Sequence, residues 1–310
     1  MSCPPLARPR PTSIRSFANG AGAAPYAVEV ISIDADRELH DAVVIAAFEG
    51  WNDAGEAASD AISHLLVAWR ATRLAMIDPE DYYDFQVNRP HVGFTSDGQR
   101  ELSWRSTSFW HCAAGAQGRD VILVTGIEPN LRWRAFCDET LDYLTGRGAT
   151  TLVTLGALLA DVPHTRPVPI TGISSDPEMV ARHGLVPSRY AGPTGIVGVI
   201  QEASHRRGLK TLSYWAAVPH YVAQPPAPKA TLALLGQLED FVGAPIDMRG
   251  LPEEAKAWER GVDELASDDS DVADYVRSLE QERDTAELPE ASGDAIAREF
   301  ERYLKRRTDD

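Results

Sequence analysis

An alternation of two patterns between about residues 42 and 220 is the feature that most constrains the fold of this chain. Short apolar runs typical of β-strands alternate with stretches of helical spacing, as in a sheet with helices on its faces. Polar and apolar residues also alternate over 99–111, which predicts an antiparallel edge strand there. The sequence therefore predicts an α/β fold with a mixed sheet and helices on both faces. The expected strands lie at 42–48, 72–77, 101–109, 120–126, 151–156 and 211–217, and the expected helices at 54–69, 134–147, 177–183, 195–207 and 229–242.

From about residue 250 onward the pattern is helical only. Residues 251–310 carry 19 acidic and 9 basic residues, which accounts for most of the formal net charge of −16. We therefore predict a disordered leader at 1–25, an α/β core domain at 26–248 and an acidic helical C-terminal extension at 249–310. Apolar residues in the extension recur at helical spacing and form three stripes: Trp258, Val262 and Leu265; Val272, Val276 and Leu279; and Ile296, Phe300, Tyr303 and Leu304.

Charge, cysteine content and hydropathy argue against several classes of protein. Nucleic-acid binding needs clustered Lys and Arg, whereas this chain is acidic. Cys3, Cys112 and Cys137 are widely spaced and form no C-x-x-C pair, so neither a disulfide framework nor a zinc site is indicated. There is no run of about 18 apolar residues that could span a membrane. We expect a cytoplasmic protein without nucleic-acid or membrane partners.

Polar side chains follow the predicted strands at their carboxyl ends, which is where ligands gather in open α/β sheets. If these strands are parallel neighbours, their polar ends share one edge of the sheet. His220 and Tyr221 follow the last strand at the same edge. We predict a ligand-binding or partner-binding surface there, the strand-end rim, formed by Glu49, Trp51, Asn52, Asp53, Asp78, Tyr82, Glu128, His164 and Arg166.

The turn FEGWNDAGEAAS, residues 48–59, has more than one interpretation. Asn52 or Asp53 precedes the expected helix, and Glu56 follows Asp53 by three residues, as in a capping box. A phosphate could use the same unpaired amides. However, G-x-x-x-x-G-K-[ST] is absent, and Asp53 and Glu56 would repel an anion. We interpret the turn as a helix cap that lies at the mouth of any site the fold possesses.

The rest of the rim also leaves alternatives open. Its carboxylates could bind a divalent metal or act as an acid and base pair, but no local spacing enforces either. His164 and Arg166 lie in the stiff segment DVPHTRP, where they could present a cation pair to an anionic group or a partner's carboxylate. Alternatively, His164 is a satisfied surface residue without a functional role. The glycines of GPTGIVGVI, among them Gly195, are interpreted as allowing close packing at a helix start.

Signatures of catalysis are missing from the sequence. There is no G-x-S-x-G nucleophile elbow, and G-x-G-x-x-G follows none of the predicted strands. We therefore predict no cofactor and no bound metal, and we lean against an enzyme.

Six segments in order resemble the bacterial branch of the proteasome assembly chaperone 2 family. They span about residues 42–243 and are FEGWNDAGEAA, AMIDPEDYYDFQVNRP, GIEPNLRW, LGALLADVPHTRP, GPTGIVGVI and VPHYVAQPPAPKATLALLGQLEDFVG. The resemblance implies a mixed α/β core similar to the purine nucleoside phosphorylase fold, assembly into homo-oligomers, in particular trimers, and proteasome subunits as partners. The family's chaperones dock through a hydrophobic-Tyr-any C-terminus, whereas this sequence ends Lys305-Arg306-Arg307-Thr308-Asp309-Asp310, which argues against docking by the tail.

Two hypotheses about function follow. The first is a non-catalytic, homo-oligomeric interaction protein of that family, whose tail helices pack across subunits. The second is an enzyme or binding protein for a small polar, nucleoside-like ligand at the carboxyl ends of the strands. In this second case acids of the rim would act on the ligand while Trp51 or Tyr82 stacks on its ring.

Overall fold

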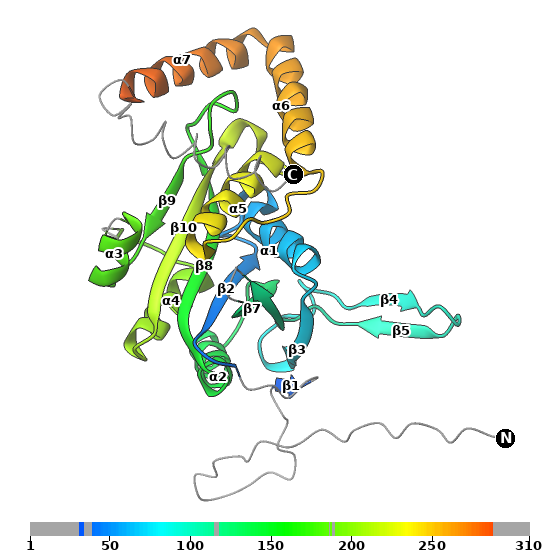
Figure 1. Cartoon of the computed structure of the whole chain (residues 1–310). Coiled ribbons are helices and arrows are strands. Elements are labelled where there is room, and N and C mark those ends of the chain that lie inside the picture. The colour runs from blue at the N-terminus through cyan, green and yellow to red at the C-terminus, as the bar shows by residue number, and fades with distance from the viewer. Residues whose placement is uncertain (1–30, 34–38, 115–117, 186, 188–189, 288–310) are drawn as a thin grey trace, which may run out of the picture.

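A mixed sheet lies between two layers of helices in the computed structural model, which describes residues 31–33, 39–114, 118–185, 187 and 190–287 (Figure 1). The strand order is β1-β3-β6-β7-β2-β8-β10-β9. The neighbours β7, β2, β8 and β10 are parallel, whereas the pairs β1–β3, β3–β6, β6–β7 and β10–β9 are antiparallel. The strands are β1 (Ile31–Ile33), β2 (Ala42–Glu49), β3 (Thr72–Ile77), β6 (Ser108–Ala114), β7 (Arg119–Ile127), β8 (Ala149–Ala160), β9 (Ile170–Ile173) and β10 (Lys210–Pro219).

Helices cover both faces of this sheet, which confirms the predicted fold class. They are α1 (Ala57–Ala68), α2 (Trp133–Gly146), α3 (Pro177–His183), α4 (Ile196–Arg206), α5 (Pro228–Val242), α6 (Leu251–Asp268) and α7 (Ser270–Glu287), with the short 3-10 turns η1 (Ala54–Glu56), η2 (Pro79–Asp81) and η3 (His220–Val222). Strand β2 is buried on both sides, because Val43 and Ile45 pack with α1 and α5 while Val44 and Phe48 pack with α2 and α4. Burial on two faces explains why its sequence is a continuous apolar run.

The segment 101–109 is the clearest difference from the predicted elements. It divides between β5 (Arg100–Ser103), which pairs with β4 (His91–Phe94) in a separate ribbon, and β6. Strand β6 is antiparallel as predicted, but it lies between β3 and β7, so its assignment to an edge is wrong. The polar residue His111 is tolerated inside the sheet because its Nε2 lies 2.7 Å from Asp120 Oδ1. The unpredicted strands β1, β4 and β9 are too short to produce a periodic pattern.

Helices α6 and α7 account for the first two apolar stripes of the extension. Helix α6 packs on α5, and α7 lies across the carboxyl ends of β8 and β10 (Figure 1). Val262, Val276 and Leu279 are buried as predicted, but Leu265 is 68% exposed. The third stripe, at 296–304, and the leader at 1–25 lie outside the described residues, and the domain boundaries stay predictions. None of the described helices has the length and apolarity needed to cross a membrane.

Candidate functional site

Just after β2, the side chains of the neighbours Asn52 and Asp53 point to opposite faces of the sheet. Asn52 Nδ2 donates a hydrogen bond of 3.2 Å to Glu128 Oε1, and the same oxygen accepts the backbone N–H of Ile196 at 2.8 Å. Ile196 is the first residue of α4, so a carboxylate from the end of β7 caps this helix. Asp53 instead accepts backbone N–H groups of α1. The end of β2 therefore joins one helix on each face of the sheet.

Asp53 caps α1 in a different way from the predicted capping box. Its Oδ1 accepts the N–H of Ala58 at 2.7 Å, and its Oδ2 accepts the N–H of Ser59 at 3.3 Å. Glu56 adopts a left-handed backbone conformation at the cap of α1, so the capping box with Glu56 is wrong. Asp53 is only 5% exposed, and this burial raises the pKa of its carboxyl to about 6. A buried carboxylate thus holds the start of α1.

Gly195 lets α4 begin in contact with the hydrogen-bonded group of Asn52, Glu128 and the N–H of Ile196, which we call the polar joint. A Cβ on Gly195 would lie 1.9 Å from Asn52 Nδ2 and 2.5 Å from Glu128 Oε1, so any side chain here would force both groups to shift. The backbone of Gly195 is extended, so glycine is required here by contact and not by its torsion angles. Glu49 lies beside the joint, where its carbonyl accepts the N–H of Glu128 at 2.8 Å and its carboxylate pairs with Arg105. The loops after β2 and β7 and the start of α4 therefore meet.

Asp78 and Tyr82 lie at the end of β3, which β6 and β7 separate from β2. Asp78 Oδ1 accepts the N–H of Glu80 at 2.9 Å and so caps the 3-10 turn η2. Tyr82 is fully buried, and its hydroxyl donates to the carboxylate of Glu139 on α2. Burial, with a smaller contribution from Glu139, raises the pKa of Tyr82 above its usual range. These two residues hold the loop after β3 in place and do not join the residues at the end of β2.

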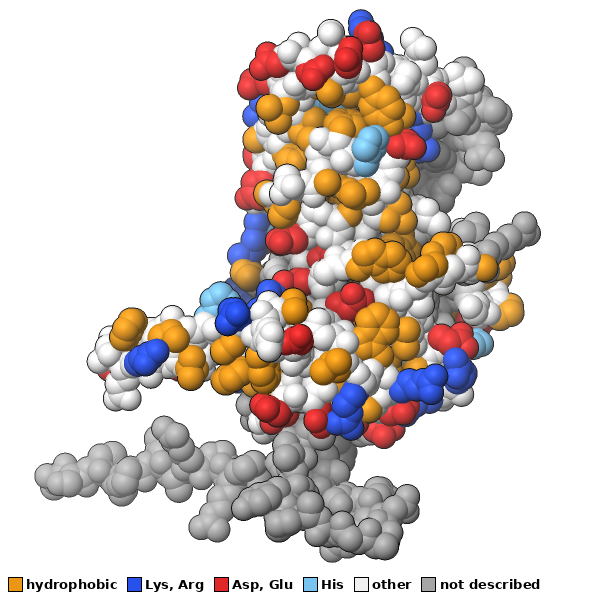
Figure 2. All heavy atoms as spheres, turned by 180° about the vertical axis from the view of Figure 1, so that it is seen from behind, with side chains coloured by type: hydrophobic (Ala, Val, Ile, Leu, Met, Phe, Trp, Pro, Cys, Tyr) orange, Lys and Arg blue, Asp and Glu red, His pale blue; other side chains and the backbone are white. Residues whose placement is uncertain are grey.

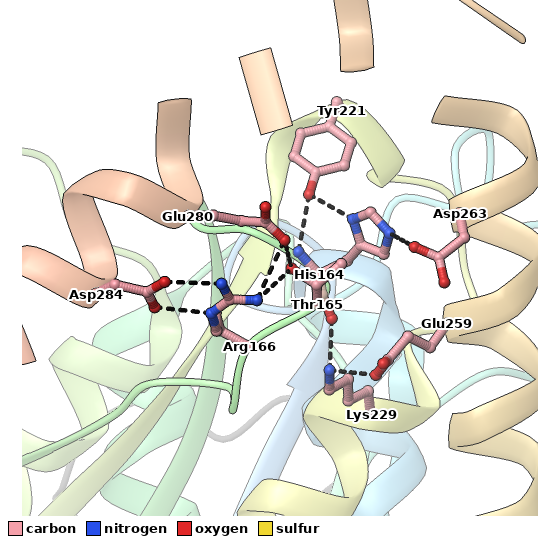
Figure 3. A network of polar contacts seen from close by, with 9 residues as sticks. All are labelled: His164, Thr165, Arg166, Tyr221, Lys229, Glu259, Asp263, Glu280 and Asp284. Carbon is pink, nitrogen blue, oxygen red and sulfur yellow. Dashed lines mark hydrogen bonds and ion pairs between the residues drawn. The ribbon is translucent and has the colours of Figure 1, made fainter. Parts of the chain in front are cut away.

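His164 lies beneath the tail helices instead of facing an open rim (Figure 3). Its Nδ1 is 2.8 Å from the hydroxyl of Tyr221, and its Nε2 is 3.0 Å from Asp263 Oδ1 on α6. The Tyr221 oxygen also accepts the backbone N–H of His164 at 2.8 Å. Nδ1 can accept the Tyr221 proton while Nε2 donates to Asp263. Both ring nitrogens of this buried histidine therefore have partners.

Arg166 binds two carboxylates of α7. Its Nε and Nη2 each donate a bond of 2.8 Å to Asp284, and its Nη1 lies 3.2 Å from Glu280 Oε1. This bidentate contact with Asp284 raises the pKa of the Arg166 guanidinium and lowers the pKa of the Asp284 carboxyl. In the described chain the carboxylates that bind this arginine belong to the chain's own tail, and its contact with an external anionic group or a partner stays a prediction.

Sequence reasoning missed the residues that hold the tail. Lys229 of α5 contacts the carbonyl of His164 and pairs with Glu259 of α6 (Figure 3). A signal for them was present, because Glu259 and Asp263, like Glu280 and Asp284, are four residues apart and share one side of a helix. We call this contact region the tail latch; it consists of His164, Thr165, Arg166, Tyr221, Lys229, Glu259, Asp263, Glu280 and Asp284.

The surroundings of the tail latch offer little room for a ligand. A hollow beside His164 is lined mainly by apolar groups, among them Val162, Val218 and Trp258, and has room for about one water molecule. In the part of the chain that the structure describes, no three His, Cys, Asp or Glu side chains gather as a metal site requires. Burial raises the pKa of the Cys112 and Cys137 thiols to about 12, so neither is a ready nucleophile.

Arg166→Ala is expected to loosen α7 without unfolding the core. The variant loses the contacts with Asp284 and Glu280, so the amides of residues 270–287 should exchange hydrogen several-fold faster, while the amides of α1 keep their wild-type rates. Hydrogen–deuterium exchange followed by mass spectrometry measures both regions. Arg206→Ala is the matched control, because Arg206 is exposed and pairs with exposed Glu202 on its own helix. Unchanged protection of α7 in Arg166→Ala would show that the tail latch does not hold it.

Comparisons with known proteins give consistent matches. A model of the PAC2 family matches residues 47–266. A PAC2 family protein from Streptomyces avermitilis is 53% identical, with a TM-score of 0.72, and the match covers 76% of this chain and 100% of that one. A proteasome-assembly chaperone homologue from Mycobacterium tuberculosis is 49% identical, with a TM-score of 0.69, and the match covers 76% and 99% of the two chains. PbaB, an archaeal proteasome activator from Pyrococcus furiosus, shares the fold at 17% identity, with a TM-score of 0.62, over 76% and 97% of the two chains. None of the curated proteins matches.

Proposed function

The chain belongs to the PAC2 family, and on this premise we propose that it is a non-catalytic, homo-oligomeric interaction protein that binds proteasome subunits during their assembly. The observation that carries the proposal is the 49% identity to the proteasome-assembly chaperone homologue from Mycobacterium tuberculosis, over 99% of that chain. Likeness at this level over a whole chain supports a shared type of partner. The proposed compartment is the cytoplasm, and the proposed oligomer is a trimer.

The chemistry of the strand-end rim supports a role without catalysis. Its polar side chains have protein partners: Glu128 and Asp53 cap helices, Asp78 caps a 3-10 turn, and His164 and Arg166 bind the tail. A general acid or base must instead reach a proton on a substrate. Trp51, which is 66% exposed, is the rim residue that offers a large free surface, and an exposed aromatic side chain suits contact with another protein.

Capture of proteasome subunits tests the proposal. The full-length chain is immobilised and exposed to its cognate proteasome core subunits, and the bound subunits are identified by mass spectrometry. An unrelated protein of similar acidity serves as the control for attraction by charge alone, because the chain carries a net charge of −16. Binding of core subunits to the chain and not to the control is expected. Equal binding to both, or binding to neither, would contradict the proposal.

A thermal-shift screen tests the rival hypothesis of a small polar, nucleoside-like ligand. Nucleosides, nucleotides and divalent ions are added one at a time to the full-length chain. A ligand that binds only the folded form at 100 times its Kd stabilises it by about 2.7 kcal/mol and raises the melting temperature. We expect no shift with any of them, because the polar groups of the rim already have partners. A saturable shift would favour the rival.

A further inference from the structure

Strands β4 and β5 form an arm, residues 87–104, that projects from the body of the molecule (Figure 1). All eight residues of the two strands are exposed. The strands pair with each other and belong to no larger sheet. A lone two-stranded hairpin is marginally stable in water, because it lacks a layer to cover its apolar face. The arm therefore presents a surface that another layer could cover.

The pairing register makes the arm two-faced. Val92 lies opposite Leu102, and Phe94 lies opposite Arg100, so these side chains share one face. Ser103 lies on the other face, opposite His91. Val92, Phe94 and Leu102 are 49%, 75% and 52% exposed, and apolar side chains are visible along the arm in Figure 2. At the base of the arm, the ring of Trp104 packs against Phe85 at 4.6 Å, which anchors the apolar face to the body.

A second exposed apolar group surrounds the polar joint at the end of β2. We call it the shoulder patch. Its members lie close in sequence to residues that the joint holds together: Trp51 precedes Asn52, Leu158 of β8 follows Ala157, Leu131 follows Glu128 by three residues, and Tyr190 precedes Gly195 by five. Glu128 bonds to both Asn52 and Ile196, and the N–H of Ala157 donates to the carbonyl of Asn52 at 2.8 Å. The shoulder patch consists of Trp51, Leu131, Leu158 and Tyr190, which are 45–69% exposed.

These two groups hold most of the exposed large apolar side chains of the described residues. Twelve large apolar side chains are exposed among the described residues, of which five lie on the arm and four on the shoulder patch. Such concentration marks contact sites, whereas scattered single residues would need no explanation. The five on the arm are Val87, Val92, Phe94, Leu102 and Trp104.

We propose that the arm of one copy of this chain docks its apolar face on the shoulder patch of a second copy. This inference rests on the proposed homo-oligomer and names the surfaces that form it. A contact between two different patches covers both patches in every copy when it is repeated around a closed ring. An arm-to-arm contact would leave the shoulder patch exposed.

The available area is of the size that such a contact needs. The two groups contain four aromatic side chains that are 43–75% exposed. At about 150–250 Å² each, these side chains offer roughly 500 Å². The five aliphatic side chains and the backbone of the arm add to this area. Together they bring it toward the total buried area of a small stable interface, about 1,200 Å².

Paired substitutions on the two faces of β5 test the role of the arm. Leu102→Asp places a charge on the apolar face of the arm. Ser103→Asp places the same charge at the adjacent residue, whose side chain lies on the opposite face of the arm. We expect Leu102→Asp to weaken association at least about thirty-fold, which is about 2 kcal/mol at 1.4 kcal/mol per tenfold. Ser103→Asp should assemble like the wild-type chain. Light scattering across a concentration series measures the mass, and circular dichroism checks that each variant is folded.

Mixing variants tests which surfaces meet. Trp51→Asp disables the shoulder patch but keeps the arm, and Leu102→Asp does the reverse. Leu265→Asp is the control for Trp51→Asp, since Leu265 is equally exposed but lies on α6. An equal mixture of Leu102→Asp and Trp51→Asp should form a species of two chains that neither variant forms alone. Leu265→Asp should assemble like the wild-type chain.

The outcomes separate this inference from the proposed function. If Leu102→Asp assembles as the wild-type chain does, the arm has no role, while the proposed oligomer stands. If the mixture yields no species of two chains, the pairing of arm with shoulder patch is wrong. A wild-type chain that stays a single copy would overturn both this inference and the homo-oligomer, but would leave the capture of proteasome subunits as a separate result.

Discussion

Between pH 3 and pH 7, the Asp53→Asn variant should gain about 3 kcal/mol in free energy of unfolding relative to the wild-type chain. Burial raises the pKa of Asp53 from 3.8 to about 6, so the folded chain holds this proton more tightly than the unfolded chain. The stability that Asp53 contributes is therefore complete below pH 3.8 and is lost as the pH rises through 6. A shift of about two units corresponds to about 3 kcal/mol. Asparagine does not titrate, and its side-chain oxygen can still cap α1.

Urea unfolding at pH 3, 5 and 7 measures this change in both proteins, because the free energy of unfolding falls linearly with urea concentration. Asp53→Ala separates the two roles of the side chain. It should show the same pH dependence as Asp53→Asn but be less stable at every pH by about 1–2 kcal/mol, because the cap is lost. Parallel curves for the wild-type chain and Asp53→Asn would show that the carboxyl is not held in a buried, proton-binding state.

Gly195→Ala should lower the free energy of unfolding by about 3 kcal/mol. The new methyl group would overlap Asn52 Nδ2 and Glu128 Oε1, so both side chains must move. Moving Glu128 leaves the buried Asn52 amide and the N–H of Ile196 without their acceptor, at about 1–3 kcal/mol for each unsatisfied group. Urea unfolding at constant pH measures the loss.

Gly261→Ala is the matched control for this substitution. Gly261 lies within α6, and a Cβ there would meet nothing within 4 Å. Because alanine favours the helix over glycine, Gly261→Ala should gain up to about 1 kcal/mol. If Gly195→Ala were as stable as Gly261→Ala, the packed joint of β2, β7 and α4 would not exist in solution.

The fold was predictable because its central strands are buried on both faces. Short apolar runs marked β2, β7, β8 and β10, and helical spacing between them marked the covering layers. The position of β6 was not predictable, because its alternating pattern resembles an exposed edge, although the pairing of His111 with Asp120 makes a polar residue acceptable inside. Short strands such as β4 and β9 leave no periodic pattern.

Part of the geometry of the rim was predictable for the same reason, whereas its role as a binding surface stays a prediction. The sequence placed Asn52 and Glu128 near each other because β2 and β7 are parallel neighbours, and they are hydrogen-bonded. It also grouped Asp78 with them, but β6 lies between β3 and β7, so β3 is two positions from β7 and three from β2. His164 and Arg166 were expected at an open surface, whereas α6 and α7 cover them. A cover supplied by residues about 100 positions later depends on tertiary packing, which no local pattern reveals.

Assembly of the proteasome core tests most directly whether this chain acts by binding other proteins and not by chemistry on a small ligand. Purified core subunits are mixed with and without the full-length chain, and the growth of assembled particles is followed by native mass spectrometry. The chain is expected to appear in complexes with unassembled subunits and to change the rate of particle formation. Identical rates, with the chain absent from every subunit complex, would contradict the proposed role in assembly.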